Sequence, residues 1–291
     1  MPVHSRNETV RWRSGRRSRN VIDRRSSGPG RGLAGGGIGL LVLVLAAMYF
    51  GVDPAFLLQG VESVTVDDTG TPATPEDLRD DPLADMIAVV VADTEDVWSH
   101  WFEQSGSRYE APRLVLFRGA TRSACGLGQA AMGPFYCPAD RNTYIDLSFY
   151  QDLETRFGAP GDFAQAYVIA HEIGHHVQNL LGIAGEVQGL QQRSDTAAAN
   201  ELSVRLELQA DCLAGVWASR AQNVTLETGD IEEALNAASA IGDDRLQQQA
   251  GGTVTPDSFT HGTSAQRQRW FGTGMRTGDP ESCDTFSAEA V

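Results

Sequence analysis

The sequence is organised around one stretch, residues 164–181, which reads AQAYVIAHEIGHHVQNLL. Within it, His171, Glu172 and His175 form a His-Glu-x-x-His motif. Residues four apart lie on one face of a helix, so both imidazoles can reach a single metal ion. Glu172 projects beside them, where it can take a proton from water held by the metal. The stretch therefore predicts an apolar helix over 162–181 that carries a metal centre and a general base.

A third protein ligand is expected, because catalytic zinc takes three and leaves one position for water. The predicted helix over 196–222 is largely apolar, yet it carries Glu207 and Asp211, which share a face. The simplest assignment places Glu207 on zinc and gives Asp211 a hydrogen bond from the outer nitrogen of a ligand histidine. Glu201 is a rival ligand that lies about 120° off that face. Cys212 is a second rival, to which we assign a structural role.

Three segments carry a resemblance to a known family: HEIGHHVQ (171–178), ELQADCLAGVW (207–217) and FTHGTSAQR (259–267). Together they resemble the bacterial putative neutral zinc metallopeptidase family, whose members often carry one N-terminal membrane helix. The resemblance covers roughly residues 60–290. It implies a zincin-like domain with one Zn²⁺ ion on His171, His175 and Glu207, and with Glu172 as the catalytic base.

His261 is a further catalytic candidate, just before a predicted helix over 264–276. A histidine across the cleft can stabilise the oxyanion that forms when water attacks a peptide carbonyl. The alternative is a loop histidine that contacts backbone, and the sequence leaves both open. His176 lies about 100° off the face of the motif and is expected to be structural.

Charge and hydropathy divide the chain into unlike parts. The formal net charge of −15 argues against a nucleic-acid-binding protein. Residues 1–32, however, hold nine basic and two acidic residues, and the next stretch, 32–52, has 21 uncharged residues. A bilayer core needs about 20 helical residues, and the positive-inside rule places the basic side in the cytoplasm. A cleaved signal peptide is the alternative.

We therefore expect a single-pass protein of the cell membrane, with its catalytic domain periplasmic or extracellular. The expected parts are a disordered basic cytoplasmic segment (1–31), a transmembrane helix in the lipid bilayer (32–52), an acidic linker (53–82) and a zinc metallopeptidase domain (83–291).

The four cysteines lie beyond that transmembrane segment, and their even number favours disulfides in an oxidising compartment. Cys125 and Cys137 flank a turn-rich stretch, which favours a bridge between them and leaves Cys212 to pair with Cys283. The sequence alone allows three pairings.

Periodicity predicts the fold class as α+β, predominantly α, with a small antiparallel sheet. Helices are expected over 83–104, 162–181, 196–222, 230–241 and 264–276, and β-like runs over 113–117 and 144–148. The predicted function is zinc-dependent hydrolysis of a peptide or protein substrate. The alternatives are a non-catalytic zincin-fold scaffold or partner-binding module, and a zinc hydrolase of a non-peptide amide.

Overall fold

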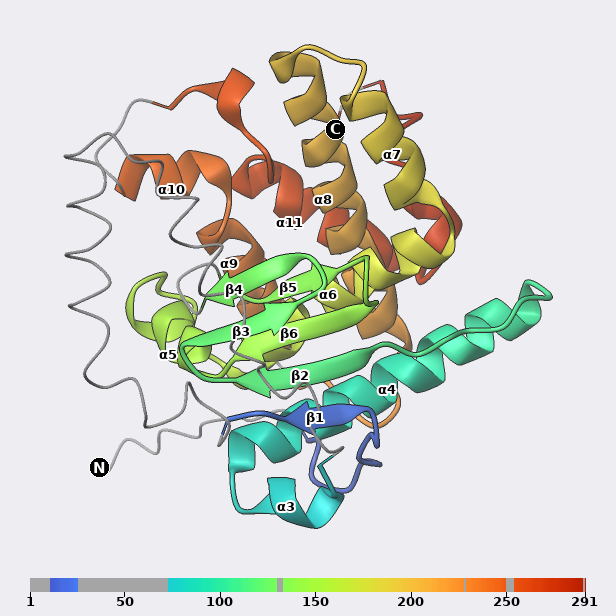
Figure 1. Ribbon diagram of the computed structural model, residues 1–291, viewed down its shortest axis with the longest axis vertical. Helices are drawn as coiled ribbons and strands as arrows, with labels where there is room; N and C mark the ends of the chain where they lie inside the picture. The colour runs from blue at the N-terminus through green and yellow to red at the C-terminus, as the bar shows by residue number, and fades with distance from the viewer. Residues whose placement is uncertain (1–10, 26–72, 130–132, 228, 250–253, 290) are drawn as a thin grey trace, which may run out of the picture.

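The computed structural model describes residues 11–25, 73–129, 133–227, 229–249, 254–289 and 291 (Figure 1). These residues are mostly helical, with two small sheets. The helices are α3 (Pro75–Arg79), α4 (Pro82–Gln104), α5 (Ser148–Thr155), α6 (Asp162–Leu180), α7 (Ile183–Gln191), α8 (Thr196–Arg220), α9 (Asp230–Ala240), α10 (Asp243–Gln249) and α11 (Ser264–Thr277), with short 3-10 turns η3 (Pro256–Ser258) and η4 (Pro280–Cys283). The five helices that periodicity predicts are confirmed to within two residues at each end.

The larger sheet has four strands in the order β1–β2–β6–β5. Strands β1 (Val21–Asp23), β2 (Arg113–Phe117) and β6 (Asn142–Asp146) are parallel, and β5 (Phe135–Cys137) pairs antiparallel with β6 at one edge. A separate hairpin joins β3 (Ala120–Ser123) to β4 (Gly126–Gln129). The sheet is therefore mixed and not antiparallel, because the hairpin and β5 make a connection long enough to return β6 parallel to β2.

Residues 11–25 are folded against the domain, which corrects the expectation of disorder for this part of 1–31. Val21 is fully buried in strand β1. The arginines that suggest a solvated segment instead pair with acids of α4: Arg17 lies 2.7 Å from Asp85. Composition alone hides this, because the matching carboxylates lie some 70 residues further along the chain.

The predicted membrane-spanning helix is not supported. Its residues, 32–52, lie outside the described part of the chain, and none of the described helices is long and apolar enough to cross a bilayer. Strand β1 precedes that stretch and β2 follows it, yet the two pair in register in one sheet. A single span between them would place them on opposite sides of a membrane. The prediction of a single-pass protein with a cytoplasmic N-terminus and an external domain is therefore wrong.

The expected acidic linker is also corrected where it can be seen, over residues 73–82. Thr74 and Asp77 form a capping box at the start of α3, and Leu78 is fully buried. The remainder of the linker, 53–72, lies outside the described residues.

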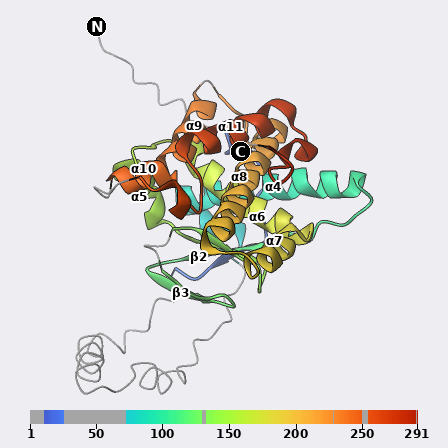
Figure 2. The ribbon, with the colours of Figure 1, turned by 90° about the horizontal axis from the view of Figure 1, so that it is seen from above.

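The core that positions the site is made by α6, α8 and α11. In Figure 1 the sheet lies towards the viewer, with α8 and α11 above and behind it, and the view from above shows α8 and α11 near each other (Figure 2). Both predicted disulfides are confirmed: Cys125–Cys137 ties the hairpin to β5, and Cys212–Cys283 ties α8 to the C-terminal segment.

Candidate metal centre

Helices α6 and α8 approach closely at Gly174, inside the His-Glu-x-x-His motif. A Cβ there would lie 2.9 Å from the carbonyl oxygen of Ala210, so a side chain at this position would push the two helices apart. Because the helices pack closely at this point, Glu207 of α8 contacts His171 and His175 of α6.

The three expected ligands converge. Nε2 of His171 lies 3.1 Å from Oε2 of Glu207, and Nε2 of His175 lies 3.4 Å from Oε1 of Glu207. All three ligand atoms lie within 4.8 Å of one another. Two ligands of a tetrahedral zinc ion, with bonds near 2.0–2.1 Å, are separated by roughly 3.3 Å. The donor set and its spacing therefore fit a zinc ion.

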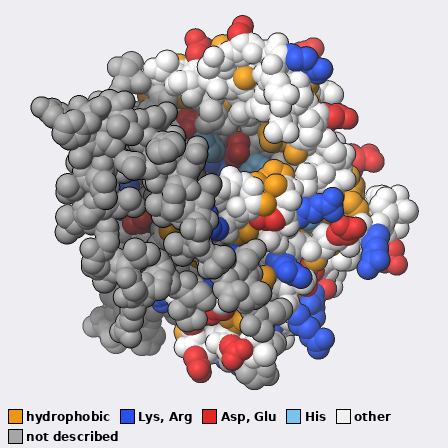
Figure 3. All heavy atoms as spheres, in the orientation of Figure 1, with side chains coloured by type: hydrophobic (Ala, Val, Ile, Leu, Met, Phe, Trp, Pro, Cys, Tyr) orange, Lys and Arg blue, Asp and Glu red, His pale blue; other side chains and the backbone are white. Residues whose placement is uncertain are grey.

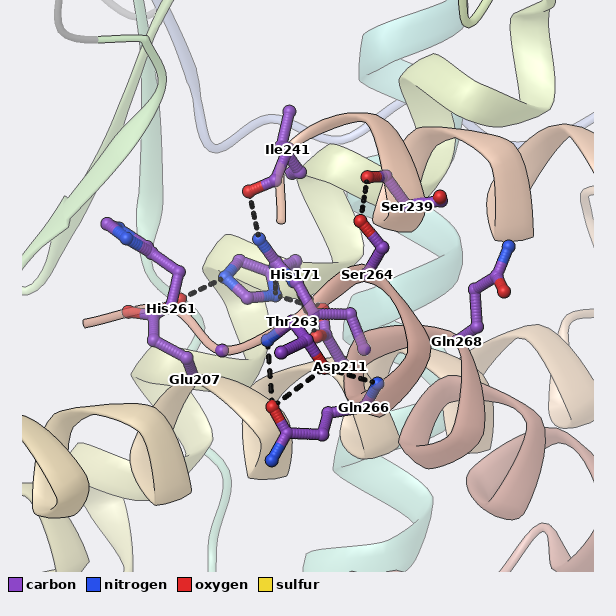
Figure 4. Close-up of polar contacts among 12 residues, drawn as sticks. His171, Glu207, Asp211, Ser239, Ile241, His261, Thr263, Ser264, Gln266 and Gln268 are labelled. Carbon is purple, nitrogen blue, oxygen red and sulfur yellow. Dashed lines mark hydrogen bonds and ion pairs between the residues drawn. The ribbon is translucent and has the colours of Figure 1, made fainter. Parts of the chain in front are cut away.

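A buried, charged network holds the outer nitrogen of His171. Its Nδ1 lies 2.9 Å from Oδ1 of Asp211, which is fully buried (Figure 4). Arg267 donates two hydrogen bonds to the Asp211 carboxylate, at 2.8 and 2.9 Å, and the hydroxyl of Tyr167 donates a third at 2.5 Å. Burial raises the pKa of Asp211, but Arg267 and His171 outweigh it and lower that pKa to about 2. The structure thus brings Asp211 to a ligand histidine, as the sequence predicts.

A neutral network holds the outer nitrogen of His175. Its Nδ1 lies 2.9 Å from Oε1 of Gln178, which is fully buried. Nε2 of Gln178 donates to the carbonyl of Leu206 at 2.7 Å and to Oε1 of Gln209 at 3.0 Å. In both histidines, therefore, Nδ1 faces a hydrogen-bond acceptor and Nε2 is left for a metal.

The electrostatics of the centre favour a cation among the ligands. Burial opposes the charged form of His171, but Asp211 and Glu207 outweigh it and raise the pKa of His171 to about 9. Burial also raises the pKa of Glu207, but the two histidines outweigh it, so that this pKa falls well below its ordinary value. A carboxylate that stays ionised between two imidazoles is suited to binding a divalent cation.

Glu172 is buried beside the ligands without being one of the three that converge. Burial raises the pKa of its carboxyl group above the ordinary value. It lines a cleft of about 500 Å³ together with His171, His175 and Glu207. Figure 3 shows this hollow, with histidine and acidic side chains at its floor.

His261 lines the same cleft, on the loop that precedes α11. Its Nδ1 lies 3.3 Å from Oδ1 of Asp243. Oδ2 of Asp243 accepts hydrogen bonds from three successive backbone N–H groups, those of Thr260, His261 and Gly262. Asp243 therefore fixes both the loop and the imidazole at the edge of the cleft.

The rival ligands lie elsewhere. The side chain of Glu201 is 63% exposed and pairs with Arg205, and Cys212 is bonded to Cys283. His176 contacts the hydroxyl of Tyr136 and the backbone carbonyl of Glu110.

Arg267, Tyr167, Gln178, Gln209 and Asp243 are the site residues that sequence reasoning missed. Arg267 lies within the FTHGTSAQR segment that carries the family resemblance, but no local pattern identifies its partner, which is 56 residues earlier. Gln178 follows His175 by three residues on the same helix, a spacing that would have suggested contact.

Comparison with known proteins gives a family and uncharacterised relatives. The family model described as "Putative neutral zinc metallopeptidase" matches residues 10–286. "Uncharacterized protein YpfJ" of Escherichia coli (strain K12) is 54% identical over 287 residues, which cover 95% of this chain and 99% of that protein. "Uncharacterized protein Rv2575" of Mycobacterium tuberculosis (strain H37Rv) is 51% identical over 192 residues, covering 62% of this chain and 64% of that protein. No solved structure matches.

Proposed function

The chain belongs to the putative neutral zinc metallopeptidase family, and from that premise we propose that it hydrolyses peptide bonds at a zinc centre. His171, His175 and Glu207 would hold the ion. One observation carries the proposal: these three ligand atoms converge at zinc spacing in a cleft that also contains Glu172.

Each residue has a role that follows from its place. Bound zinc would act as a Lewis acid towards water and the substrate carbonyl. Glu172 would accept one proton from the attacking water at its carboxylate and return it to the leaving amine nitrogen. Its burial supports this cycle, because a raised pKa brings the carboxyl group closer to the balance point that proton transfer needs.

His261 would donate a hydrogen bond to the substrate oxygen as negative charge develops there. The support is its position at the cleft and its contact with Asp243. Asp243 raises the pKa of the imidazole and so favours the form in which both ring nitrogens donate.

The cleft also suggests which peptides fit. Beyond the ligands its walls carry apolar side chains: Phe135, Phe149, Phe157, Val168, Ile241 and Leu246. An apolar wall favours substrates with an apolar side chain beside the scissile bond.

The variant Glu172→Gln tests the proposal. Zinc content and turnover of unfolded casein are measured for the wild type and for this variant. We expect both proteins to hold one zinc ion and only the wild type to hydrolyse casein, because residue 172 acts as a base without binding the metal. A wild type that holds zinc and cleaves neither casein nor a library of apolar peptides would overturn the proposal, in favour of the non-catalytic scaffold or of a hydrolase of a non-peptide amide. A wild type without affinity for zinc would contradict both the hydrolytic function and a scaffold built around zinc.

A further inference from the structure

A chain of buried hydrogen bonds leads from the metal centre to the C-terminal segment. It begins at Nδ1 of His175, passes through the amides of Gln178 and Gln209, and ends on the backbone carbonyl of Cys283. The last link, from Nε2 of Gln209 to that carbonyl, is 3.0 Å long. Gln178 is fully buried and Gln209 is only 6% exposed.

The direction of each bond is set by chemistry. The carbonyl of Cys283 can only accept, so it takes the amide N–H of Gln209 and turns Oε1 of Gln209 towards α6. That oxygen and the backbone carbonyl of Leu206 both accept from Nε2 of Gln178, which leaves Oε1 of Gln178 facing His175. A neutral imidazole must then carry its proton on Nδ1, so its Nε2 lone pair is directed to the metal position.

The carbonyl at the end of the chain is held by covalent and polar attachments to α8. Cys283 is bonded to Cys212, and both are buried. Two residues on, Thr285 donates to the backbone carbonyl of Arg205 and accepts from its guanidinium, at 2.7 and 2.5 Å. The C-terminal segment is thereby fixed against the same helix that supplies Glu207.

We propose that Gln209 and the Cys212–Cys283 bridge are positioning elements for the metal ligand His175. The bridge places the Cys283 carbonyl, and the carbonyl orients Gln209. Gln209, together with the carbonyl of Leu206, orients the Gln178 amide that fixes the imidazole. Metal affinity therefore depends on the C-terminal segment, which does not itself reach the ligands. This inference rests on the proposed function, since it takes His175 to be a zinc ligand.

The test measures the zinc dissociation constant by competition with a chromophoric chelator. It also records the ¹⁵N resonances of histidine in the zinc-free protein, at a pH above the raised pKa values of His171 and His175, where both imidazoles are neutral. Gln209→Leu breaks the chain with the bridge intact, and Gln191→Leu is its matched control. Gln191 donates to Ser203 and Ala199 on α8 but does not contact the centre. Cys212→Ser/Cys283→Ser removes the bridge, and Cys125→Ser/Cys137→Ser removes the other one.

We expect Gln209→Leu and Cys212→Ser/Cys283→Ser each to weaken zinc binding about 10-fold. This is the lower end of the range found when a direct partner of a metal ligand is removed, because Gln209 acts through Gln178, which keeps its bond to Leu206. Both should also shift one histidine from the Nδ1–H form towards a mixture of tautomers without metal present. The two control proteins should match the wild type. Combining Gln209→Leu with the loss of the bridge should add little, because both break one chain.

The outcomes separate this inference from the proposed function. If Gln209→Leu retains wild-type zinc affinity and histidine resonances, the inference is overturned, even if loss of the bridge weakens binding by unfolding the protein. If Gln191→Leu weakens zinc binding as much as Gln209→Leu, the effect is general destabilisation and the inference is again overturned. If the wild type itself does not bind zinc, the proposed function fails.

Discussion

The two candidate ligand histidines occupy one helix four residues apart, yet they are held by unlike surroundings. His171 contacts a fully buried carboxylate, Asp211, which is matched by the buried guanidinium of Arg267. His175 contacts a neutral amide, Gln178. Both arrangements direct Nε2 to the same point, so they are geometrically equivalent. They differ in energy: the charged network is strong only while complete, whereas the amide network loses less when one member is removed.

The largest effect is expected at Glu207, because its carboxylate contacts both His171 and His175. Glu207→Ala removes the proposed third metal ligand, so we expect the purified protein to lose stoichiometric zinc. Glu201→Ala is the matched control, because this residue lies on the same helix with an exposed side chain. Metal analysis of the two proteins decides the assignment. Zinc retained by Glu207→Ala and lost by Glu201→Ala would show that the third ligand is Glu201.

The next largest effect is expected in the charged network. Asp211→Ala leaves Arg267 buried, only 2% exposed, without its carboxylate partner. Breaking one side of a buried ion pair costs about 3–5 kcal/mol. We expect that loss in the free energy of unfolding, measured by urea denaturation of the zinc-free protein.

The double variant Asp211→Ala/Arg267→Leu is the control for this prediction. It removes both charges and should recover part of the lost stability, because replacing a whole buried pair is tolerated better than breaking it. If Asp211→Ala is as stable as the wild type, the Asp211–Arg267 ion pair does not contribute to stability and the prediction is wrong.

Helix periodicity and residue spacing predict the part of the site that depends on contacts within one helix. His171, His175, Glu207 and Asp211 were found because each pair lies four apart on one helix, and the structure brings the two pairs together. Arg267 was not found, since its side chain crosses from α11 to α8 and no local pattern encodes that contact.

The prediction of disorder for the N-terminal segment is wrong over residues 11–25 for the same reason: its contacts are with residues far along the chain. Its arginines suggest a solvated chain, but Arg16 and Arg17 are paired with acids of α4, and the strand between the basic residues is only three residues long. A strand this short, at the edge of a sheet, carries too little alternation to be recognised without its partner.

A smaller effect is expected in the amide network. Gln178→Leu keeps the buried volume but leaves Nδ1 of His175, Oε1 of Gln209 and the carbonyl of Leu206 without their amide partner. The carbonyl of Leu206 keeps its hydrogen bond within α8. At about 1 kcal/mol for each of the other two groups, which are neutral, the loss in unfolding free energy should be about 2 kcal/mol, below that of Asp211→Ala. The same denaturation measurement tests this ranking. Gln188→Leu, on the neighbouring α7, serves as a control for amide loss away from the centre. A larger loss of unfolding free energy for Gln178→Leu than for Asp211→Ala would show that the amide network contributes more to stability than the charged network.

The smallest effect is expected from Tyr167→Phe, which removes one hydroxyl from the charged network. That hydroxyl donates to Oδ1 of Asp211 and accepts from Arg267 at 3.3 Å. Asp211 keeps its two bonds from Arg267 and its contact with His171, so the expected cost is about 1 kcal/mol.

Tyr167→Phe also tests whether the charged network and the amide network contribute to stability independently. The Tyr167 hydroxyl and the Gln178 amide share no hydrogen-bond partner among the described contacts. The unfolding free energies of Tyr167→Phe and Gln178→Leu should therefore add within about 0.5 kcal/mol in the double variant. A larger coupling energy, measured in a double-mutant cycle on zinc-free protein, would mean that the packed imidazoles transmit strain from one support to the other. The charged and neutral networks would then act as a single unit.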